Sequence, residues 1–314
     1  MSLYDRCCPF CFSHNFDILL NLKIEDFAPL NPTYDLDQIV FMGFAQDQRF
    51  PIVKCRHCGF VFSLYGLSEQ QTNHLYSNVI DLKKSLLHRR NTTKPWHSLT
   101  LLYILFFLSS KMSQNNDVLF LDFGCGHGEI MHLAKACGAQ CFGVEIELHK
   151  IKLLREQGFI VNKTLDAIMT LKPFDLVHCH QVLEHVPDPW QTLKSIAEVT
   201  KSGGYCFFSV PNFRAKILKK VCKEYFSNKK LSSKSINPWE HLNYFSPSNF
   251  REMLQKSGFK VLGPFSSASL LNNSGTFILD LPDSYALLKN VIKEILRGFW
   301  TRRIMSTNLI VQRV

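Results

Sequence analysis

The sequence lacks a long uninterrupted hydrophobic segment. Its longest apolar run, Leu99–Leu108, has ten residues and is broken by Thr100, whereas a helix that spans a bilayer needs about 20. The first ten residues, MSLYDRCCPF, also lack the basic and then apolar regions of a secretory signal peptide. The sequence therefore argues against a transmembrane segment and against conventional secretion, and we expect a cytoplasmic protein.

Acidic residues are scarcer than basic ones, since 26 Asp and Glu stand against 36 Lys and Arg, which gives a formal net charge of +10. A basic balance favours anionic partners such as phosphates, nucleic acids or membrane surfaces. The basic residues form only small clusters, such as Lys216–Lys223, that are typical of solvated helix faces. With 46% hydrophobic and 20% charged residues over 314 positions, we expect a globular chain of about two domains.

Cysteine is plentiful, and its spacing is informative. Cys8 and Cys11 form one CxxC pair, Cys55 and Cys58 form a second, and 43 residues separate the pairs. In a reducing compartment, metal binding is favoured over disulfide formation. Two CxxC turns can give a closed tetrahedral thiolate site, the geometry of structural zinc. We therefore predict a structural zinc ion on these four residues, with Cys7 as an alternative to Cys8.

Local sequence patterns divide the chain into three parts. We predict a small zinc-ribbon-like domain over residues 1–65, a helical connector over 66–112 and a larger α/β domain over 113–314. The connector includes a very apolar helix near Trp96–Leu108. In the third part, predicted strands and helices alternate, which is typical of a doubly wound, mostly parallel sheet. The predicted strands are Val118–Asp122, Gln140–Glu145, Phe174–Cys179, Tyr205–Val210, Phe259–Leu262 and Asn308–Val311. The first predicted helix follows the glycine-containing loop after Asp122 and ends near Cys137. The other predicted helices are Leu148–Gln157, Asp188–Thr200 and Tyr285–Trp300.

A glycine-rich loop follows the first of these strands. Gly124, Gly126 and Gly128 come directly after Asp122, and Glu145 lies 23 residues after Asp122, at the end of the next strand. Glycines allow a sharp turn and close approach to a ligand, and an acid in the position of Glu145 can hold both ribose hydroxyls of a nucleoside. The glycine spacing is GxGxG, whereas dinucleotide-binding loops have GxGxxG. Asp122 and Glu145 also make the site negatively charged, which suits a ligand with a cationic sulfonium better than one with an anionic pyrophosphate.

At these residues the sequence resembles the class I S-adenosylmethionine-dependent methyltransferases of the small-molecule type, over residues 113–263 and less closely at the C-terminus. The resemblance implies a Rossmann-like sheet, a glycine loop on the methionine half of the cofactor and Glu145 on its ribose. It also places Thr164–Ala167, with Asp166, beside the adenine. Two further landmarks are similar to the family: His180–Pro189, which contains LEHVPDP, and Gly203–Asn212, which contains GGY and VPN.

The landmark His180–Pro189 also supplies candidate ligand contacts. His180 and Gln181 leave a strand at its carboxyl end, where ligands bind in such sheets, so we expect both to contact the cofactor and His180 also to face the acceptor. His185 follows closely and is either a catalytic or an architectural loop residue.

The segment Trp239–Pro247 resembles the EH-x-x-Y-[FS]-S element of methyltransferases with an N-terminal zinc-binding region, including sugar C-methyltransferases. Histidine titrates near neutral pH, so we predict His241 as the general base. Glu240 or Tyr244 then orients His241 or binds substrate, and both His241 and Tyr244 are expected to face the pocket while Phe245 packs in the core. The alternative is that His241 and Tyr244 hold a loop that caps the pocket.

The sequence thus predicts transfer of a methyl group from S-adenosylmethionine to a small molecule, such as a sugar or another secondary metabolite. An alternative is an RNA-modifying methyltransferase that uses the zinc region and the basic clusters. Against it, the Asn/Asp-Pro-Pro-aromatic signature of amino-group methylation is missing, and His180–Leu183 stands in its place. The chain departs from the sugar C-methyltransferases, because a helix-rich insert at Ala268–Arg303 takes the place of their additional C-terminal α/β domain.

Overall fold

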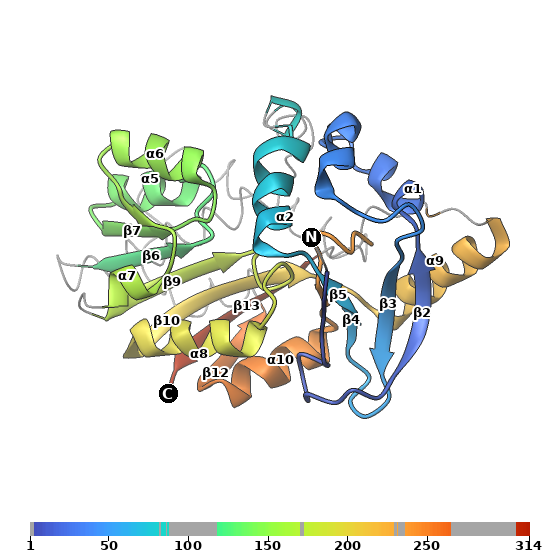
Figure 1. Cartoon of the computed structure of the whole chain (residues 1–314). Helices are drawn as coiled ribbons and strands as arrows, with labels where there is room; N and C mark the ends of the chain where they lie inside the picture. Colours follow the sequence, from blue (N-terminus) through green and yellow to red (C-terminus); the bar gives the residue numbers. More distant parts are fainter. Residues whose placement is uncertain are drawn as a thin grey trace, which may run out of the picture.

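A seven-stranded, largely parallel sheet forms the centre of the chain from residue 119 onward in the computed structural model (Figure 1). The structure describes residues 3–81, 83–85, 87, 118–169, 173–228, 231, 236–264 and 306–314. The strand order is β12-β13-β10-β9-β6-β7-β8, and β13 runs antiparallel to both of its neighbours. The strands are β6 (Leu119–Phe123), β7 (Gln140–Val144), β8 (Ile160–Asn162), β9 (Phe174–His180), β10 (Thr200–Pro211), β12 (Phe259–Pro264) and β13 (Ser306–Arg313).

Helices cover both faces of this sheet. Figure 1 shows α5 and α6 on one side and α8 and α10 on the other. Because both faces are covered, the central strands are almost continuously apolar. The side chain of Asp188 caps α8 by accepting the amide of Gln191, and Pro189 occupies the first turn, where its missing N–H costs no hydrogen bond. The helices of this part are α5 (Glu129–Ala136), α6 (Leu148–Glu156), α7 (Asp166–Met169), α8 (Pro189–Val199), α9 (Ala215–Asn228) and α10 (Pro247–Lys256).

The predicted alternation of strands and helices is confirmed, with a mixed rather than wholly parallel sheet. The predicted helices near Trp96–Leu108 and Tyr285–Trp300, and the whole insert Ala268–Arg303, lie outside the described residues. Among the described residues, no helix is long and apolar enough to cross a membrane.

A second, antiparallel sheet lies in the N-terminal region, and its strand order is β11-β4-β3-β2 (Figure 1). Its outer strand β11 comes from residues 243–244, where Asn243 pairs with Phe62 and Tyr244 with Val61. The sheet is therefore built from both parts of the chain. The N-terminal elements are β1 (Tyr4–Asp5), β2 (Phe16–Leu22), α1 (Ile24–Phe27), η1 (Ala28–Leu30), η2 (Leu36–Met42), β3 (Phe50–Cys55), β4 (Val61–Ser63), β5 (Tyr65–Gly66), α2 (Glu69–His74) and the π-helical turn η3 (Leu75–Val79), and β11 is Asn243–Tyr244.

Hydrophobic cores also cross the predicted boundary at residue 65. Phe60 stacks edge-on against Phe245 with ring centroids 5.4 Å apart, in a core that continues into the central sheet. Trp239 packs against Phe27 and Phe50, at 4.9 and 5.8 Å. The N-terminal region and the α/β part therefore share buried surface.

Arg6 joins the same two regions with hydrogen bonds. Its guanidinium is 6% exposed and donates to the carbonyl oxygens of Ser63, Leu242 and Pro187 and to Oδ1 of Asn243. A buried guanidinium is stabilised only when its donors are satisfied, and here the four acceptors lie on three segments: the end of β4, the loop before α8 and residues 242–243 at the start of β11. Arg6 therefore fixes the N-terminal strand, the loop before α8 and β11 relative to one another.

Candidate cofactor and acceptor site

The glycine loop lies at the carboxyl end of β6. Gly124, Gly126 and Gly128 all have positive φ angles, of 80°, 55° and 76°. A Cβ on Gly124 would lie 2.3 Å from Cγ2 of Val182, so only glycine fits there. A Cβ on Gly126 would meet nothing within 4 Å. The loop is thus tightly packed at Gly124 and open at Gly126, which is the face available to a ligand.

Glu145 follows β7 and closes the other side of this loop. Its side chain is buried, and its oxygens accept the amide of Gly126 at 2.8 Å and those of Ile146 and Glu147 at 2.8 and 3.0 Å. These hydrogen bonds hold the carboxylate beside the loop in a fixed orientation. Gly126 and Glu145 are therefore held side by side, and together they could hold a nucleoside ligand, with its ribose at the acid and its tail past the open glycine.

Asp122 lies beneath the loop, as the last buried residue of β6. Its Oδ1 lies 2.7 Å from Nδ1 of His178, which is on the adjacent strand β9, and both side chains are almost fully buried. The ring of His178 in turn stacks on that of His180, with centroids 5.8 Å apart. Asp122 therefore supports the floor of the site through His178.

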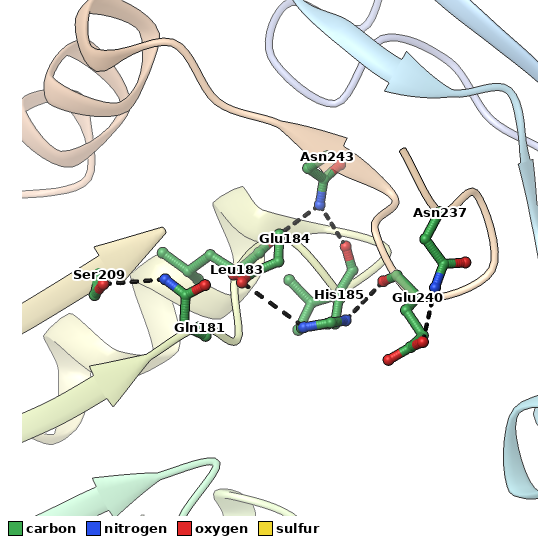
Figure 2. Close-up of polar contacts among 9 residues, drawn as sticks. Gln181, Leu183, Glu184, His185, Ser209, Asn237, Glu240 and Asn243 are labelled. Carbon is green, nitrogen blue, oxygen red and sulfur yellow. Dashed lines mark hydrogen bonds and ion pairs between the residues drawn. The ribbon is translucent and has the colours of Figure 1, made fainter. Parts of the chain in front are cut away.

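Gln181 adopts an unusual backbone conformation directly after β9. Its φ angle is 56°, a region that non-glycine residues seldom occupy, and its amide and side chain both bond to Ser209, at 2.9 and 3.1 Å. Figure 2 shows the side-chain contact between the ends of β9 and β10. This strained turn directs the following residues, 182–188, across the carboxyl ends of the strands.

Glu184 and His185 lie in that turn and meet His241. Glu184 is 1% exposed, and burial raises its pKa to about 8. Nδ1 of His185 bonds to the carbonyl oxygen of Glu240 at 2.7 Å, while its Nε2 lies 3.7 Å from Oε1 of Glu184 (Figure 2). Burial, together with the adjacent His241, lowers the pKa of His185 to about 3, so this imidazole is neutral. The rings of His185 and His241 lie 5.0 Å apart.

The carboxylate of Glu240 contacts the N-terminal region. Its Oε1 accepts hydrogen bonds from Tyr34 Oη at 2.5 Å, Asn31 Nδ2 at 3.1 Å and Asn237 Nδ2 at 2.7 Å. The backbone carbonyl of Glu240 thus binds His185, and the carboxylate of Glu240 anchors the segment that carries His241 to the N-terminal region. Its side chain has the character of an anchor rather than of a substrate ligand.

Tyr244 occupies a different place from the one that the sequence predicts. It is 4% exposed in hydrophobic packing, with its ring 4.9 Å from that of Phe213, and Asn243, the other residue of the strand, is 2% exposed. Successive residues of a strand point to opposite faces, and here both faces are buried. We therefore correct the assignment of Tyr244 from the acceptor site to packing. Asp166, by contrast, is exposed at the start of α7, just after β8.

The four cysteines of the CxxC pairs converge although they are far apart in the sequence. All four sulfur atoms lie within 4.8 Å of one another, with Cys8 3.5 Å from Cys58 and Cys11 3.5 Å from Cys55. Sulfurs at tetrahedral corners around zinc, with bonds of about 2.3 Å, lie about 3.8 Å apart. Burial opposes ionisation of Cys55, but amides of Cys58 and His57 outweigh it and lower its pKa to about 7. These four residues can hold a metal ion, and Cys7 is not in the cluster.

Two important groups carry no signal in the sequence. Glu184 stands within a recognisable motif, but nothing in its spacing indicates a buried carboxylate without a hydrogen-bond partner among the described residues. Arg6 looks like one basic residue among many. Only the contacts between distant segments reveal both roles.

The fold and the site together define a class of protein, a Rossmann-like α/β transferase with a nucleoside site at the carboxyl ends of its strands. A sequence profile described as "Methyltransferase domain" matches residues 74–263, more than half of the chain. The chain belongs to this methyltransferase family, and it is an S-adenosylmethionine-dependent methyltransferase.

Several relatives are similar over much of the chain. The ubiquinone biosynthesis O-methyltransferase of Nitrosospira multiformis is 29% identical over 201 residues, which cover 59% of this chain and 82% of that protein. The protein of the same name from Idiomarina loihiensis is 35% identical over 136 residues, covering 39% and 54%. Among solved structures, the plantazolicin methyltransferase BamL has a TM-score of 0.48 at 15% identity, covering 77% of this chain and 94% of that one.

Proposed function

We propose that the enzyme transfers the methyl group of S-adenosylmethionine to an oxygen atom of a small-molecule acceptor. The observation that carries this proposal is the arrangement of two adjoining sites at one edge of the sheet. The Gly126–Glu145 pair fits the cofactor, and the polar cluster of Glu184, His185 and His241 lies on the loops that follow β9 and precede β11. The names of the relatives, which are O-methyltransferases, support oxygen as the receiving atom.

We assign the cofactor contacts residue by residue. The loop of Gly124, Gly126 and Gly128 contacts the methionine portion of the cofactor, and the carboxylate of Glu145 accepts hydrogen bonds from the ribose hydroxyls. Asp166 lies beside the adenine, and Gln181, with His180, borders the methyl end. Asp122 does not contact the cofactor directly in this assignment, but supports the site through its hydrogen bond to His178. The bound cofactor supplies an electrophilic methyl group on a sulfonium, and the protein orients the acceptor oxygen behind it.

We assign His241 to removal of the acceptor's proton. Its ring lies against His185 in the cluster, and its amide is fixed by the carbonyl oxygen of Asn237 at 2.7 Å. An acceptor hydroxyl must lose its proton as the methyl group arrives, and a positioned group that assists this step contributes about 10²- to 10⁴-fold. The acceptor class that we favour is a hydroxylated metabolite, with sugars included because of the resemblance of the Trp239–Pro247 segment.

The experiment combines cofactor binding with product analysis. Titration calorimetry should show binding of S-adenosylmethionine and S-adenosylhomocysteine but not of NAD. Methyl-labelled cofactor is then offered with a panel of hydroxylated small molecules and, separately, with RNA. Label in the small-molecule fraction supports the proposal, whereas label in RNA alone contradicts it.

His241→Ala tests the proposed step. It should lower turnover by about 10²- to 10⁴-fold and leave cofactor affinity unchanged. If His241→Ala instead lowers both the stability and the cofactor affinity, with no selective loss of turnover, His241 has a structural role in the loop.

We also propose that Cys8, Cys11, Cys55 and Cys58 bind one structural zinc ion. The support is the convergence of the sulfur atoms, with the closest pairs 3.5 Å apart. Four thiolates fill the coordination of zinc and leave no position for a substrate, so this ion stabilises the fold. Elemental analysis of protein purified without added metal tests this proposal, and Cys11→Ser should abolish the binding.

A further inference from the structure

A second group of metal-ligating side chains lies away from the cysteines. Glu184, His185 and His241 each offer a ligand atom, and these atoms lie within 4.8 Å of one another. Glu184 and His185 lie in the turn after β9 (Figure 2), while His241 comes from the segment before β11. Two separate parts of the chain are thus brought together at one point beside the acceptor site.

The carboxylate of Glu184 is the most informative member of this group. It is 1% exposed, and neither of its oxygens has a hydrogen-bond partner among the described residues. Its distance of 3.7 Å to Nε2 of His185 is too long for a hydrogen bond. A buried carboxylate stays ionised only with donors, a paired charge or a metal ion beside it, because desolvation otherwise favours the protonated form.

His185 has the orientation of a metal ligand. Its Nδ1 lies 2.7 Å from the carbonyl oxygen of Glu240, so Nδ1 carries the proton and donates it. The lone pair of Nε2 is therefore free to bind on the side of Glu184. Metal-binding histidines commonly have this arrangement, in which one ring nitrogen donates to a carbonyl and the other binds the ion.

The backbone holds the two contributing segments in register. The carbonyl oxygen of Glu184 accepts the amides of Leu242 and Asn243 at 2.7 and 3.0 Å, and Nδ2 of Asn243 donates to the carbonyl oxygens of Leu183 and Val186 (Figure 2). The ligand atoms therefore rest on a rigid frame. Two ligands with bonds of about 2.1 Å to one ion lie about 3.4 Å apart at a tetrahedral angle, close to the 3.7 Å between Glu184 and His185.

We propose that Glu184, His185 and His241 bind a divalent transition-metal ion of the zinc type. Two imidazoles and one carboxylate are a donor set that suits such ions, and three protein ligands leave a coordination position open. The site differs in this respect from the cysteine cluster, whose four thiolates would close the coordination sphere. Its open position takes an oxygen of the acceptor.

This inference rests on the proposed function and changes the role of His241 within it: as a metal ligand, His241 promotes loss of the acceptor's proton through the ion and does not itself accept that proton. The acceptor hydroxyl binds the ion, which favours loss of its proton to water. The oxygen then uses its electron pair to form the bond to the methyl carbon. The carbon–sulfur bond breaks with its pair remaining on sulfur, which yields the methyl ether and neutral S-adenosylhomocysteine. His241 thus acts through the ion, and the substrate class narrows to acceptors whose hydroxyl can bind a metal.

The test counts metal ions in protein that retains its cysteines. Metal-free full-length protein is titrated with Zn²⁺, and bound zinc is measured after removal of the excess. The variants are Glu184→Gln and His241→Asn, and the matched controls are Glu156→Gln and His132→Asn, on exposed positions of α6 and α5. We expect each site variant to bind one zinc ion fewer per chain than wild type, and each control to bind the same number.

Cofactor binding, measured by calorimetry on the same samples, separates the two hypotheses. Unchanged binding of S-adenosylhomocysteine in Glu184→Gln, together with the loss of one zinc ion, supports the inference. The same zinc count in wild type and both site variants overturns it, while cofactor binding and methyl transfer still support the proposed function. Loss of one zinc ion in a protein that binds no cofactor would instead uphold the metal site and defeat the proposed function.

Discussion

At the scale of single residues, the charge of Glu145 should determine much of the affinity for S-adenosylmethionine. Glu145→Gln keeps the shape of the side chain but removes the negative charge that we assign to the ribose hydroxyls. A hydrogen bond to a charged group is worth about 1.5–3 kcal/mol, so affinity for S-adenosylmethionine should fall about 10- to 150-fold in calorimetry. Glu156→Gln, on the exposed end of α6, is the control. Equal affinities for the two variants would remove Glu145 from the cofactor site.

The glycines of the loop should differ from one another. Gly124→Ala adds a methyl group that would lie 2.3 Å from Val182, in a left-handed conformation, so we expect a loss of stability of about 2–4 kcal/mol. Gly126→Ala meets no protein atom within 4 Å, so it should cost only about 1–2 kcal/mol of backbone strain and yet weaken cofactor binding. Chemical denaturation and calorimetry measure the two effects. A Gly126→Ala protein with wild-type affinity would place the ligand elsewhere.

These residues also show which parts of the site a sequence can reveal. The positions of Gly124, Gly126 and Glu145 after two neighbouring strands were predictable, because they depend on local backbone geometry and on a fixed spacing between the strands. Glu184 was not, since its significance lies in the absence of donors around it, which only the packed structure shows. Tyr244 was assigned to the wrong environment because both faces of its two-residue strand are buried.

At the scale of elements, Arg6 connects three segments and should contribute far more to the free energy of unfolding than an exposed arginine does. Arg6→Met removes four hydrogen bonds to buried or partly buried acceptors. Leaving those acceptors without a donor should lower the free energy of unfolding by about 3–5 kcal/mol. Arg56→Met is the matched control, because Arg56 pairs with Asp17 at the surface, where such pairs contribute about 1 kcal/mol or less. Urea denaturation of both variants gives the comparison, and similar losses would contradict the role of Arg6.

The elements themselves were predictable to different degrees. Six of the seven strands of the central sheet were predicted, with ends within five residues of the observed ones, because covered strands are continuous apolar runs between turns. Strand β8 was not predicted. The strand β2 and the short helical turns before residue 43 were not predicted. Strand β11 has two residues, and its existence depends on the edge of β4, which the local sequence does not encode.

At the scale of the whole molecule, the shared cores and the shared sheet predict a single cooperative unit. The N-terminal sheet takes β11 from residues 243–244, and Trp239 and Phe245 pack against residues that precede position 65. Unfolding followed by circular dichroism and by loss of cofactor binding should therefore give coincident transitions. Two separate transitions would show that residues 1–65 form the independent domain that the sequence suggested.

Removal of the proposed structural zinc should then destabilise the entire enzyme and not a local region. Zinc on the four cysteines binds only the folded protein, so its removal by a chelator subtracts its binding free energy from the folding of every element in the cooperative unit. We expect the melting temperature of the α/β part, reported by cofactor-dependent signals, to fall by about 10 °C or more. The zinc-site variant Cys11→Ser, which keeps the Glu184, His185 and His241 group, serves as the control, and its melting temperature should respond to the chelator less than that of wild type. A chelator that leaves the melting temperature of wild type unchanged would show that the cysteines of the N-terminal region stabilise the fold without a metal ion.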